Sequence, residues 1–330
     1  MSVTEDLGSE GRTGVQYLDV AEDEAGLRLD KFLAERLPGV PRTRLFRIIR
    51  KGEVRVNGGR VGPEARLAAS DRVRVPPLRL EAPGPTEPAA RGPSAAVLER
   101  VRRAIIHEDA RLLVLDKPAG LAVHGGSGID FGIIEALRAL RPGEPLELVH
   151  RLDRDTSGCL LVARTAAALR TAHALLREGR SEKRYLALLC GRWDLGHKRI
   201  DAPLRTDTRV GGERTVRVGP GGKPSVSAFR LVQNYGRRGR AGPKASLLEV
   251  TLHTGRTHQI RVHAAYAGHP VAGDPKYGDA ACNAALRQLG LKRMFLHAHS
   301  MSFEWPDGGT FSASAPLPEE LSALLGRLER

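Results

Sequence analysis

The sequence is poor in cysteine and in aromatic residues, and it has no long hydrophobic run. Its three cysteines, Cys159, Cys190 and Cys282, lie far apart without a CxxC pair, a pattern that supports neither a disulfide framework nor a zinc ribbon. Aromatic residues make up 4% of the chain, too few for a nonspecific single-strand binder that relies on stacking. No apolar run approaches the ~18 residues of a membrane span, and the first residues lack the basic-then-apolar order of a secretory signal. We therefore expect a protein of the reducing cytoplasm without a membrane partner.

Positive charge is what the chain has in excess. Lys and Arg number 52 against 38 Asp and Glu, a formal net charge of +14 at pH 7, which favours a polyanionic partner such as nucleic acid. Residues 1–24 hold one basic residue against seven acidic ones, whereas residues 25–80 hold fourteen against five. A length of 330 residues suggests about two domains. We predict an acidic disordered tail over 1–24 and a basic folded module over 25–77.

The module over 25–77 combines helical and strand patterns. Apolar spacing predicts a helix over 27–37, and a second helix begins after Pro41 and ends at Gly52. Asn57-Gly58 between short strands indicates a hairpin, and 71–75 indicates another strand. The ordered segments LRLDKFL, PRTRL, VRVNG and DRVRV resemble the RNA-binding domain of ribosomal protein S-four. RNA contacts are expected from the second helix and the hairpin, at Arg42, Arg44, Arg47, Lys51 and Asn57, although a solvated basic helix face is the alternative interpretation.

The remaining chain divides into a linker and a larger unit. Residues 78–94 are rich in proline and glycine and predict a semi-rigid linker. Over 95–330 the predicted strands and helices alternate irregularly, which favours an α+β fold with a mixed, mainly antiparallel sheet and flanking helices. Strands are expected at 111–118, 159–164, 184–191 and 246–254, and helices at 132–140, 165–179 and 257–268, the last with Thr257 as its N-cap.

Two polar clusters in the larger unit could carry chemistry. In HRLDRDTSG (150–158), Asp153 and Asp155 lie between apolar stretches. They could act as a carboxylate pair on a glycosidic bond, or one of them could cap the turn. In TGRTHQIRVH (254–263), Arg256 precedes a helix N-terminus, where the dipole does not favour a cation, so we expect Arg256 to reach a carboxylate elsewhere.

The same clusters offer little for a metal or a nucleotide cofactor. His258 and His263 are five residues apart, off a common helical face, and no HExxH motif or Cys/His quartet is present. The phosphate-loop pattern GxxxxGK[ST] is also missing. We expect neither a metal nor an organic cofactor.

The two clusters occur together with KRYLALLCG (183–191) and MFLHAHSMSF (294–303). These four segments follow one another in the order seen in the RluA family of pseudouridine synthases, which the chain therefore resembles. The resemblance covers about residues 25–327. HGGSGIDFGIIEALRALRP (124–142) is most similar to the RluC type. The resemblance implies that uridine is isomerised to pseudouridine at several positions of 23S ribosomal RNA or its large-subunit precursor, by a monomer without a cofactor. The alternatives are another RNA target, namely an RluD-type ribosomal RNA helix or a tRNA loop, and a noncatalytic role in ribosome assembly. A glycosidase that used Asp153 and Asp155 would not account for the basic module over 25–77.

The resemblance also implies roles for individual residues. Asp153 would be the essential aspartate, Arg256 would pair with it, and Tyr185 would pack on the target base. Arg151 would help displace that base from its stack, and His150 would contact the RNA. These roles suit the chemistry, because breaking a glycosidic bond without a metal needs a carboxylate at the anomeric carbon. A guanidinium would hold that carboxylate ionised and oriented once the flipped base excludes water.

Overall fold

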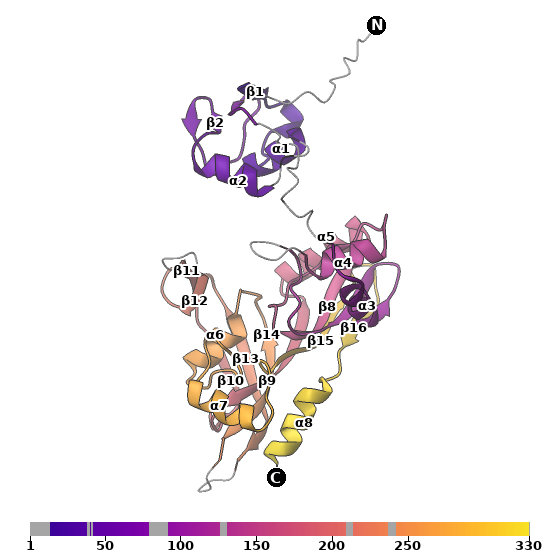
Figure 1. The fold of residues 1–330 in the computed structure, drawn as a ribbon, viewed down its shortest axis with the longest axis vertical. Coiled ribbons are helices and arrows are strands. Elements are labelled where there is room, and N and C mark those ends of the chain that lie inside the picture. Colours follow the sequence, from indigo (N-terminus) through magenta and orange to yellow (C-terminus); the bar gives the residue numbers. More distant parts are fainter. Residues whose placement is uncertain are drawn as a thin grey trace. The chain divides into compact units, whose positions relative to one another are not determined.

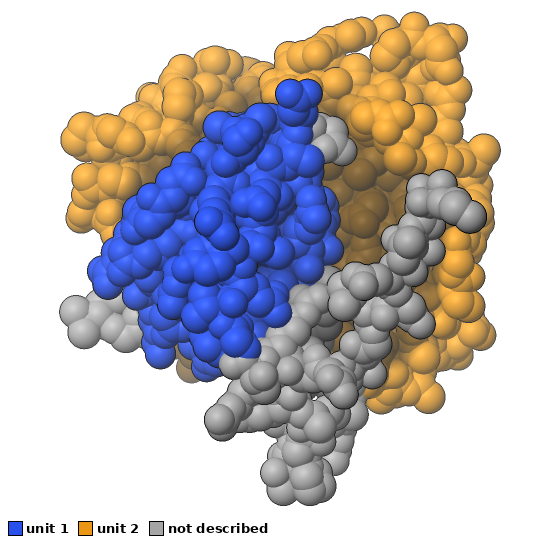
Figure 2. All heavy atoms as spheres, turned by 90° about the horizontal axis from the view of Figure 1, so that it is seen from above, with its two compact units in different colours: residues 1–89 blue, residues 90–330 orange. Residues whose placement is uncertain are grey.

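The computed structural model describes residues 14–37, 40, 42–78, 92–125, 131–208, 214–236 and 242–329. The chain divides into two compact units, residues 1–89 and 90–330, which Figure 2 draws in separate colours. Within the described ranges, no helix has both the length and the apolar character that a membrane span requires.

The first unit packs two helices against a small sheet with the strand order β1-β4-β2-β3. The predicted hairpin is confirmed: Asn57 and Gly58, at φ 51° and 79°, form the turn with the left-handed backbone that this tight connection needs. Gly52, at φ 71°, follows the end of the second helix as expected. The elements are β1 (Gln16–Asp19), a 3-10 helix (Glu22–Glu24), α1 (Leu29–Arg36), α2 (Arg42–Arg50), β2 (Arg55–Val56), β3 (Gly59–Arg60) and β4 (Arg72–Val75).

The acidic N-terminal segment is partly ordered, contrary to the prediction of a disordered tail. β1 pairs antiparallel with β4, with Leu18 opposite Val73, and Val20 is buried in this unit's core. The prediction is therefore wrong for residues 16–24; residues 1–13 lie outside the described part of the chain. The acidic net charge of residues 1–24 indicated disorder, but the short alternating strand β1 forms because it pairs with the basic strand β4. Of the predicted linker, Leu78 is buried in the same core, and residues 79–91 are not described.

The second unit is built on a ten-stranded sheet, whose main path runs β10-β13-β14-β9-β15-β8-β6-β5. β16 pairs with β15 and β7 with β8, and β11 and β12 form a separate hairpin. Among the described strand pairs, β15–β8 is the one parallel pair, so the predicted α+β fold with a mainly antiparallel sheet is confirmed. The strands are β5 (Ile105–Glu108), β6 (Leu112–Lys117), β7 (Glu147–Leu148), β8 (Ser157–Ala163), β9 (Ser181–Cys190), β10 (Lys198–Asp201), β11 (Leu204–Thr208), β12 (Arg214–Val218), β13 (Val226–Tyr235), β14 (Ala245–Leu252), β15 (Leu296–Glu304) and β16 (Thr310–Ser314).

Helices cover both faces of this sheet (Figure 1). Successive strand residues point to opposite sides, so the apolar residues of one strand pack against helices on both faces. On β9, Tyr185 and Ala187 join the core under α3, α4 and α6, whereas Leu188 and Cys190 pack with α7 and α8 on the other face. α5 covers that second face farther along the sheet, over β6 and β8. The helices are α3 (Ala95–Arg103), α4 (Ile133–Leu140), α5 (Ala166–Arg177), α6 (Gln259–Tyr266), α7 (Ala280–Gln288) and α8 (Glu319–Leu328).

Gly158 lets the two parallel strands approach each other where β8 begins. Its φ is +108°, and a Cβ atom there would collide with the backbone of Ala298 on β15. Only glycine tolerates both the backbone conformation and the missing space. The close contact fixes where the HRLDRDTSG segment enters the sheet.

A disulfide joins Cys190, at the end of β9, to Cys282 in α7, with the Cα atoms 6.2 Å apart. The expectation of no disulfide is therefore wrong for this structure. The two residues are separated by 92 positions, and sequence spacing does not show that the chain folds α7 back onto the sheet. Cys159 is a buried free thiol.

Candidate active site

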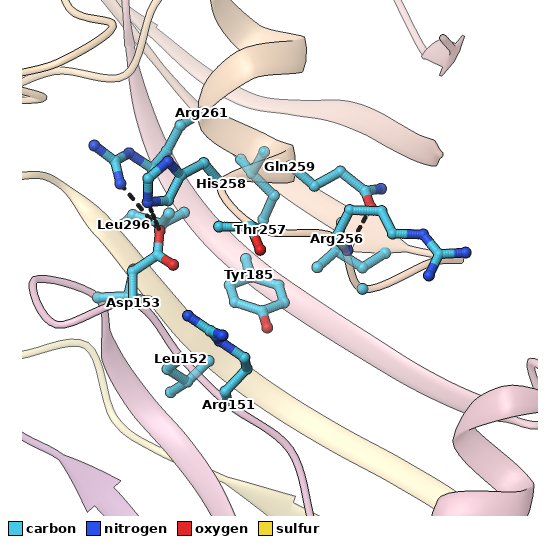
Figure 3. Close-up of a pocket in the computed structure, with 14 residues that line it drawn as sticks. Arg151, Leu152, Asp153, Tyr185, Arg256, Thr257, His258, Gln259, Arg261 and Leu296 are labelled. Carbon is cyan, nitrogen blue, oxygen red and sulfur yellow. Dashed lines mark hydrogen bonds and ion pairs between the residues drawn. The ribbon is translucent and has the colours of Figure 1, made fainter. Parts of the chain in front are cut away.

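Asp153 lies in a tight turn between β7 and β8, at an open pocket of about 100 Å³ (Figure 3). The Thr156 N–H donates to the Asp153 carbonyl at 3.1 Å and closes the turn. The side chain of Asp153 is 19% exposed, so its carboxylate can meet a ligand in the pocket while its backbone is fixed.

Lys117, at the end of β6, anchors this turn from below. It is fully buried, and its Nζ donates to the carbonyls of Arg154, Leu121 and Pro118 at 2.8, 2.7 and 3.1 Å. Burial lowers the pKa of Lys117 to about 7, although the charges of Asp155 and Asp153 oppose the shift. The amine therefore ties the residue after Asp153 to the loop that leaves β6.

The arginine that pairs with Asp153 is Arg261, not Arg256. Arg261 Nη1 donates to Asp153 Oδ2 at 3.1 Å, whereas Arg256 Nε donates to the Pro224 carbonyl at 3.3 Å and its guanidinium points away from Asp153 (Figure 3). The expected Asp153–Arg256 pair is therefore wrong. Arg256 lies in the loop before α6, and Arg261 lies within α6, on the side that meets the turn.

A second carboxylate, Asp274, holds the guanidinium of Arg261 in place. Its Oδ2 accepts from Arg261 Nε at 2.7 Å and its Oδ1 from Nη2 at 2.9 Å, which leaves Nη1 for Asp153. The backbone N–H groups of Lys276 and Tyr277 also donate to Asp274. Burial alone would raise the pKa of the Asp274 carboxyl, but Arg261 and these donors hold it below its ordinary value. The same two carboxylates keep the pKa of Arg261 raised despite burial.

The loop before α6 is held by Gln259, which is 2% exposed. Its Oε1 accepts from the Thr254 hydroxyl at 2.8 Å and from the Arg256 N–H at 3.0 Å, and its Nε2 donates to the Val226 carbonyl at 2.9 Å. The N-cap of α6 is His258, in the left-handed conformation at φ 55°; the prediction of Thr257 is wrong. The hydrogen bonds of Gln259 fix the loop so that the helix begins one residue later than predicted, at residue 259. The preference of threonine for N-cap positions does not reveal this.

Tyr185 and Arg151 line the pocket beside Asp153, and Figure 3 shows Tyr185 between Asp153 and Arg256. Tyr185 is 8% exposed; burial and the charge of Asp153 raise the pKa of its hydroxyl. Arg151 is exposed at the pocket. The structure thus brings together three residues that the sequence singled out.

Other residues of the sequence prediction lie elsewhere or are engaged internally. His150 Nε2 accepts from the Leu161 N–H at 3.2 Å, and burial lowers the pKa of His150 to about 4; it is not among the residues found to line the pocket. Asp155 pairs with Arg154 at 3.4 Å and also lies outside that lining.

In the first unit, Arg47 and Lys51 are exposed and Arg44 is half-buried on or just after α2, which presents a cationic face. Arg42 begins α2. The side chain of Asn57 is occupied internally: its Nδ2 donates to Asp71 at 2.8 Å and its Oδ1 accepts from the Arg72 N–H at 2.9 Å. The structure gives the Asn57 side chain a role in holding the hairpin turn to β4 and supplies no support for the expected RNA contact.

Sequence reasoning missed Arg261, Asp274, Gln259 and Tyr277. One signal was available for Arg261: it lies between Ile260 and Val262 in a helix whose residues 259–264 are all buried, and a buried arginine requires a partner. Nothing in the sequence indicates that this partner is Asp274. In the described part of the chain, no group of three His, Cys, Asp or Glu side chains could hold a metal ion.

Comparisons with known proteins show which families and structures the chain is similar to. The family model described as RNA pseudouridylate synthase matches residues 111–266, and the S4 domain model matches residues 27–73. Among solved structures, human RNA Pseudouridylate Synthase Domain Containing 1 is 29% identical with a TM-score of 0.55, covering 67% of this chain and 86% of its own. Human RNA Pseudouridylate Synthase Domain Containing 4 is 25% identical with a TM-score of 0.56, covering 71% and 95%.

Curated relatives match almost the whole chain. The ribosomal large subunit pseudouridine synthase C of Pasteurella multocida is 50% identical, covering 95% of this chain and 94% of its own length. The protein of the same name from Escherichia coli K12 is 47% identical, covering 95% and 97%. The chain belongs to the RNA pseudouridylate synthase family, with an S4 domain at its N-terminal side, and the resemblance seen in its motifs is confirmed.

Proposed function

We propose that this enzyme isomerises several uridines of 23S ribosomal RNA, or of its large-subunit precursor, to pseudouridine. The observation that carries the chemistry is Asp153, held by Arg261 at a pocket that Tyr185 also lines. The target is supported by curated relatives from Pasteurella multocida and Escherichia coli that are named for the large ribosomal subunit. The exposed cations of α2 and the S4 domain match support an RNA partner.

In this proposal Asp153 supplies the carboxylate at the anomeric carbon of the flipped uridine. Asp153 already has Arg261 as a partner when the base displaces water from the pocket, so its charge is balanced and its direction fixed. The ring of Tyr185, which lines the pocket beside Asp153, packs on the base. Arg151, exposed at the pocket, fills the gap that the flipped base leaves; flipping costs a few kcal/mol that this contact partly offsets.

Arg256 takes a different role in the proposal from the one its motif suggested. No carboxylate among the described residues forms an ion pair with it, and it lines both the catalytic pocket and a neighbouring hollow that contains Lys223. A guanidinium so placed suits a phosphate of the RNA backbone. Arg42, Arg44, Arg47 and Lys51 would supply further phosphate contacts, which position the RNA without reading its sequence. We propose action in the cytoplasm as a monomer; sedimentation of the purified protein tests the second point.

The test is complementation of an Escherichia coli strain that lacks its own ribosomal large subunit pseudouridine synthase C, followed by pseudouridine mapping of all stable RNA. The wild-type chain should restore more than one pseudouridine in 23S RNA and none in 16S RNA or tRNA. Asp153→Asn should restore none, because losing a catalytic carboxylate commonly costs several orders of magnitude in rate. Asp155→Asn is the matched control and should behave as wild type.

Three outcomes would count against the proposal or a part of it. Modification confined to tRNA, or to the helix that RluD-type enzymes use, would refute the 23S assignment and leave the reaction intact. If Asp153→Asn restored modification within tenfold of wild type, Asp153 would not be the catalytic carboxylate. Rescue of ribosome assembly by Asp153→Asn without any modification would favour a noncatalytic binding role.

A further inference from the structure

The four-stranded sheet of the first unit has one face against the core and one face turned outward. Leu18, Val73 and Val56 lie directly opposite one another on β1, β4 and β2, and they belong to or pack against the apolar core of this unit. Because successive strand residues point to opposite faces, the neighbouring row points outward. That row crosses all four strands in the order Tyr17, Arg74, Arg55 and Arg60.

The stability of the fold does not explain this row of arginines. Arg74 lies opposite Arg55, and Arg55 lies opposite Arg60; like charges directly opposite each other destabilise a strand pair. Among the described residues, no carboxylate forms an ion pair with any of the three. The one acid on the outer face of the described strands, Asp19, lies 3.9 Å from Arg72 instead. The row is therefore a concentration of positive charge that the described part of the chain does not balance.

The backbone holds these side chains in place without occupying all of their donors. Arg74 Nη1 donates to the Glu53 carbonyl at 2.9 Å, and Arg55 Nη1 donates to the Gly58 carbonyl at 3.3 Å. Arg55 and Arg74 are half-buried and Arg60 is exposed. A guanidinium has five N–H donors, so each of the three arginines keeps most of its donors for a ligand.

Further cations extend the row at both of its ends. At one end, the side chain of Arg60 lies against Gly52, where a Cβ atom would collide with it, and Gly52 directly follows Lys51, whose side chain is 64% exposed. At the other end, the guanidinium of Arg72 stands 4.5 Å from the centre of the Tyr17 ring, and Tyr17 is 53% exposed. The positive charge thus runs across the whole outer face of the sheet.

The chemistry of the row suits a phosphate backbone. A guanidinium is always charged, and its planar fork binds phosphate oxygens two at a time. Adjacent strands lie about 4.8 Å apart, so the three arginines span roughly 10 Å, a length over which a nucleic-acid strand presents more than one phosphate. A single small anion would meet only part of the row. RNA is the polyanion that the proposed function brings to this chain, and this inference rests on that function.

We propose that the outer face of this sheet is an RNA-binding face, on which Arg55, Arg60 and Arg74 hold phosphates of 23S ribosomal RNA. It is a different surface from the cationic face of α2 that the sequence pattern indicated. Because its contacts are made to phosphates, the face positions the RNA without reading its sequence. It therefore contributes to affinity and leaves the isomerisation step unchanged.

The test measures binding of the full-length chain to transcribed Escherichia coli 23S RNA at several KCl concentrations. Arg55→Gln/Arg60→Gln/Arg74→Gln should flatten the dependence of log affinity on log salt by about 2 to 3, and should bind ~100-fold more weakly at about 0.1 M salt. Arg55→Lys/Arg60→Lys/Arg74→Lys keeps the charges and should keep the slope, with a smaller loss of affinity. Arg66→Gln is the matched control and should bind as wild type, because Arg66 is an exposed arginine of the same unit outside the four strands.

Equal slopes for the glutamine triple variant and the wild type would overturn the inference, and an acidic protein surface would then be the partner that the charge suits. A flattened slope in the lysine variant or in Arg66→Gln would also overturn it, because the effect would not follow the charge of the row. If the triple variant has a lowered unfolding midpoint, Arg55→Gln/Arg60→Gln decides the question, since it keeps the bond of Arg74 to the backbone; it should flatten the slope by about 1.4 to 1.8.

The rate of pseudouridine formation at saturating enzyme separates this inference from the proposed function. The glutamine triple variant should modify 23S RNA within twofold of the wild-type rate. Normal modification with an unchanged salt slope would overturn the sheet face alone. A wild-type chain that binds 23S RNA without modifying it would contradict the proposed function, and the slopes would still decide for or against the sheet face.

Discussion

Replacement of Arg261 by methionine should show that its guanidinium balances two carboxylates at once. The variant leaves Asp274, whose side chain is 0% exposed, with two backbone donors and no countercharge. Removing one partner of a buried pair typically costs roughly 3–5 kcal/mol, and Asp274 fits that case because water cannot reach it. Asp153 is 19% exposed and should add less.

The structure also predicts that substitutions of Arg261 and Asp274 change the free energy of unfolding non-additively. In the double variant Arg261→Met/Asp274→Asn the buried position 274 no longer carries an uncompensated charge, and the partly exposed Asp153 is unpaired as in the single variant. The free energy of unfolding of the double variant should therefore exceed the value expected from adding the two single losses by ~2 kcal/mol. Urea unfolding followed by tryptophan fluorescence measures this, because both tryptophans, Trp193 and Trp305, lie in the second unit. The control cycle uses Arg230 and Glu249, a pair with a largely exposed arginine that should couple by less than ~1 kcal/mol.

Additivity of the two single losses within ~0.5 kcal/mol would refute this reasoning. Single-turnover rates on RNA give a second reading. Arg261→Lys keeps the charge but cannot make all three side-chain hydrogen bonds, so it should retain more activity than Arg261→Met and remain well below the wild type. Equal activity of Arg261→Lys and wild type would mean that the orientation of Asp153 does not depend on the clamp.

Three further predictions follow from single features. Arg256→Ala should weaken RNA affinity more than it lowers the single-turnover rate; the reverse would place Arg256 in the chemistry. The triple variant Arg44→Ala/Arg47→Ala/Lys51→Ala should flatten the dependence of log affinity on log salt by roughly 0.7–0.9 for each RNA phosphate that the variant no longer neutralises, and an unchanged slope would mean that α2 does not touch RNA. Burial lowers the pKa of His297 to about 4 from 6.5, so between these pH values the unfolded chain binds a proton that the folded chain does not. The free energy of unfolding should therefore fall by up to ~3 kcal/mol as the pH drops from 6.5 to 4. His297→Gln should reduce this loss in urea titrations, and an unchanged pH slope would contradict the role given to His297.

Local pattern sufficed for much of the fold. The strand of 184–191 and the helix of 165–179 appear within a few residues of their predicted bounds, since alternating or helically spaced apolar residues already indicate which face is buried. The Asn57-Gly58 turn was readable from sequence as well, because few residues adopt a left-handed backbone. The strand over 16–19 was not, since its order depends on pairing with β4.

The candidate site divides in the same way. The sequence by itself singled out Asp153, Tyr185 and Arg151, which the structure brings together at one pocket, and it indicated the family, because these residues lie in compact motifs whose order can be read along the chain. Only the tertiary structure decided which arginine reaches Asp153, that Asp274 holds it, and that Cys190 meets Cys282. Arg256 and Arg261 are five residues apart and chemically equal, and what separates them is the direction of α6 relative to the turn. That direction is set by packing between segments more than a hundred positions apart. The charged side chains of Arg261 and Asp153 therefore meet only after this packing has brought their segments together.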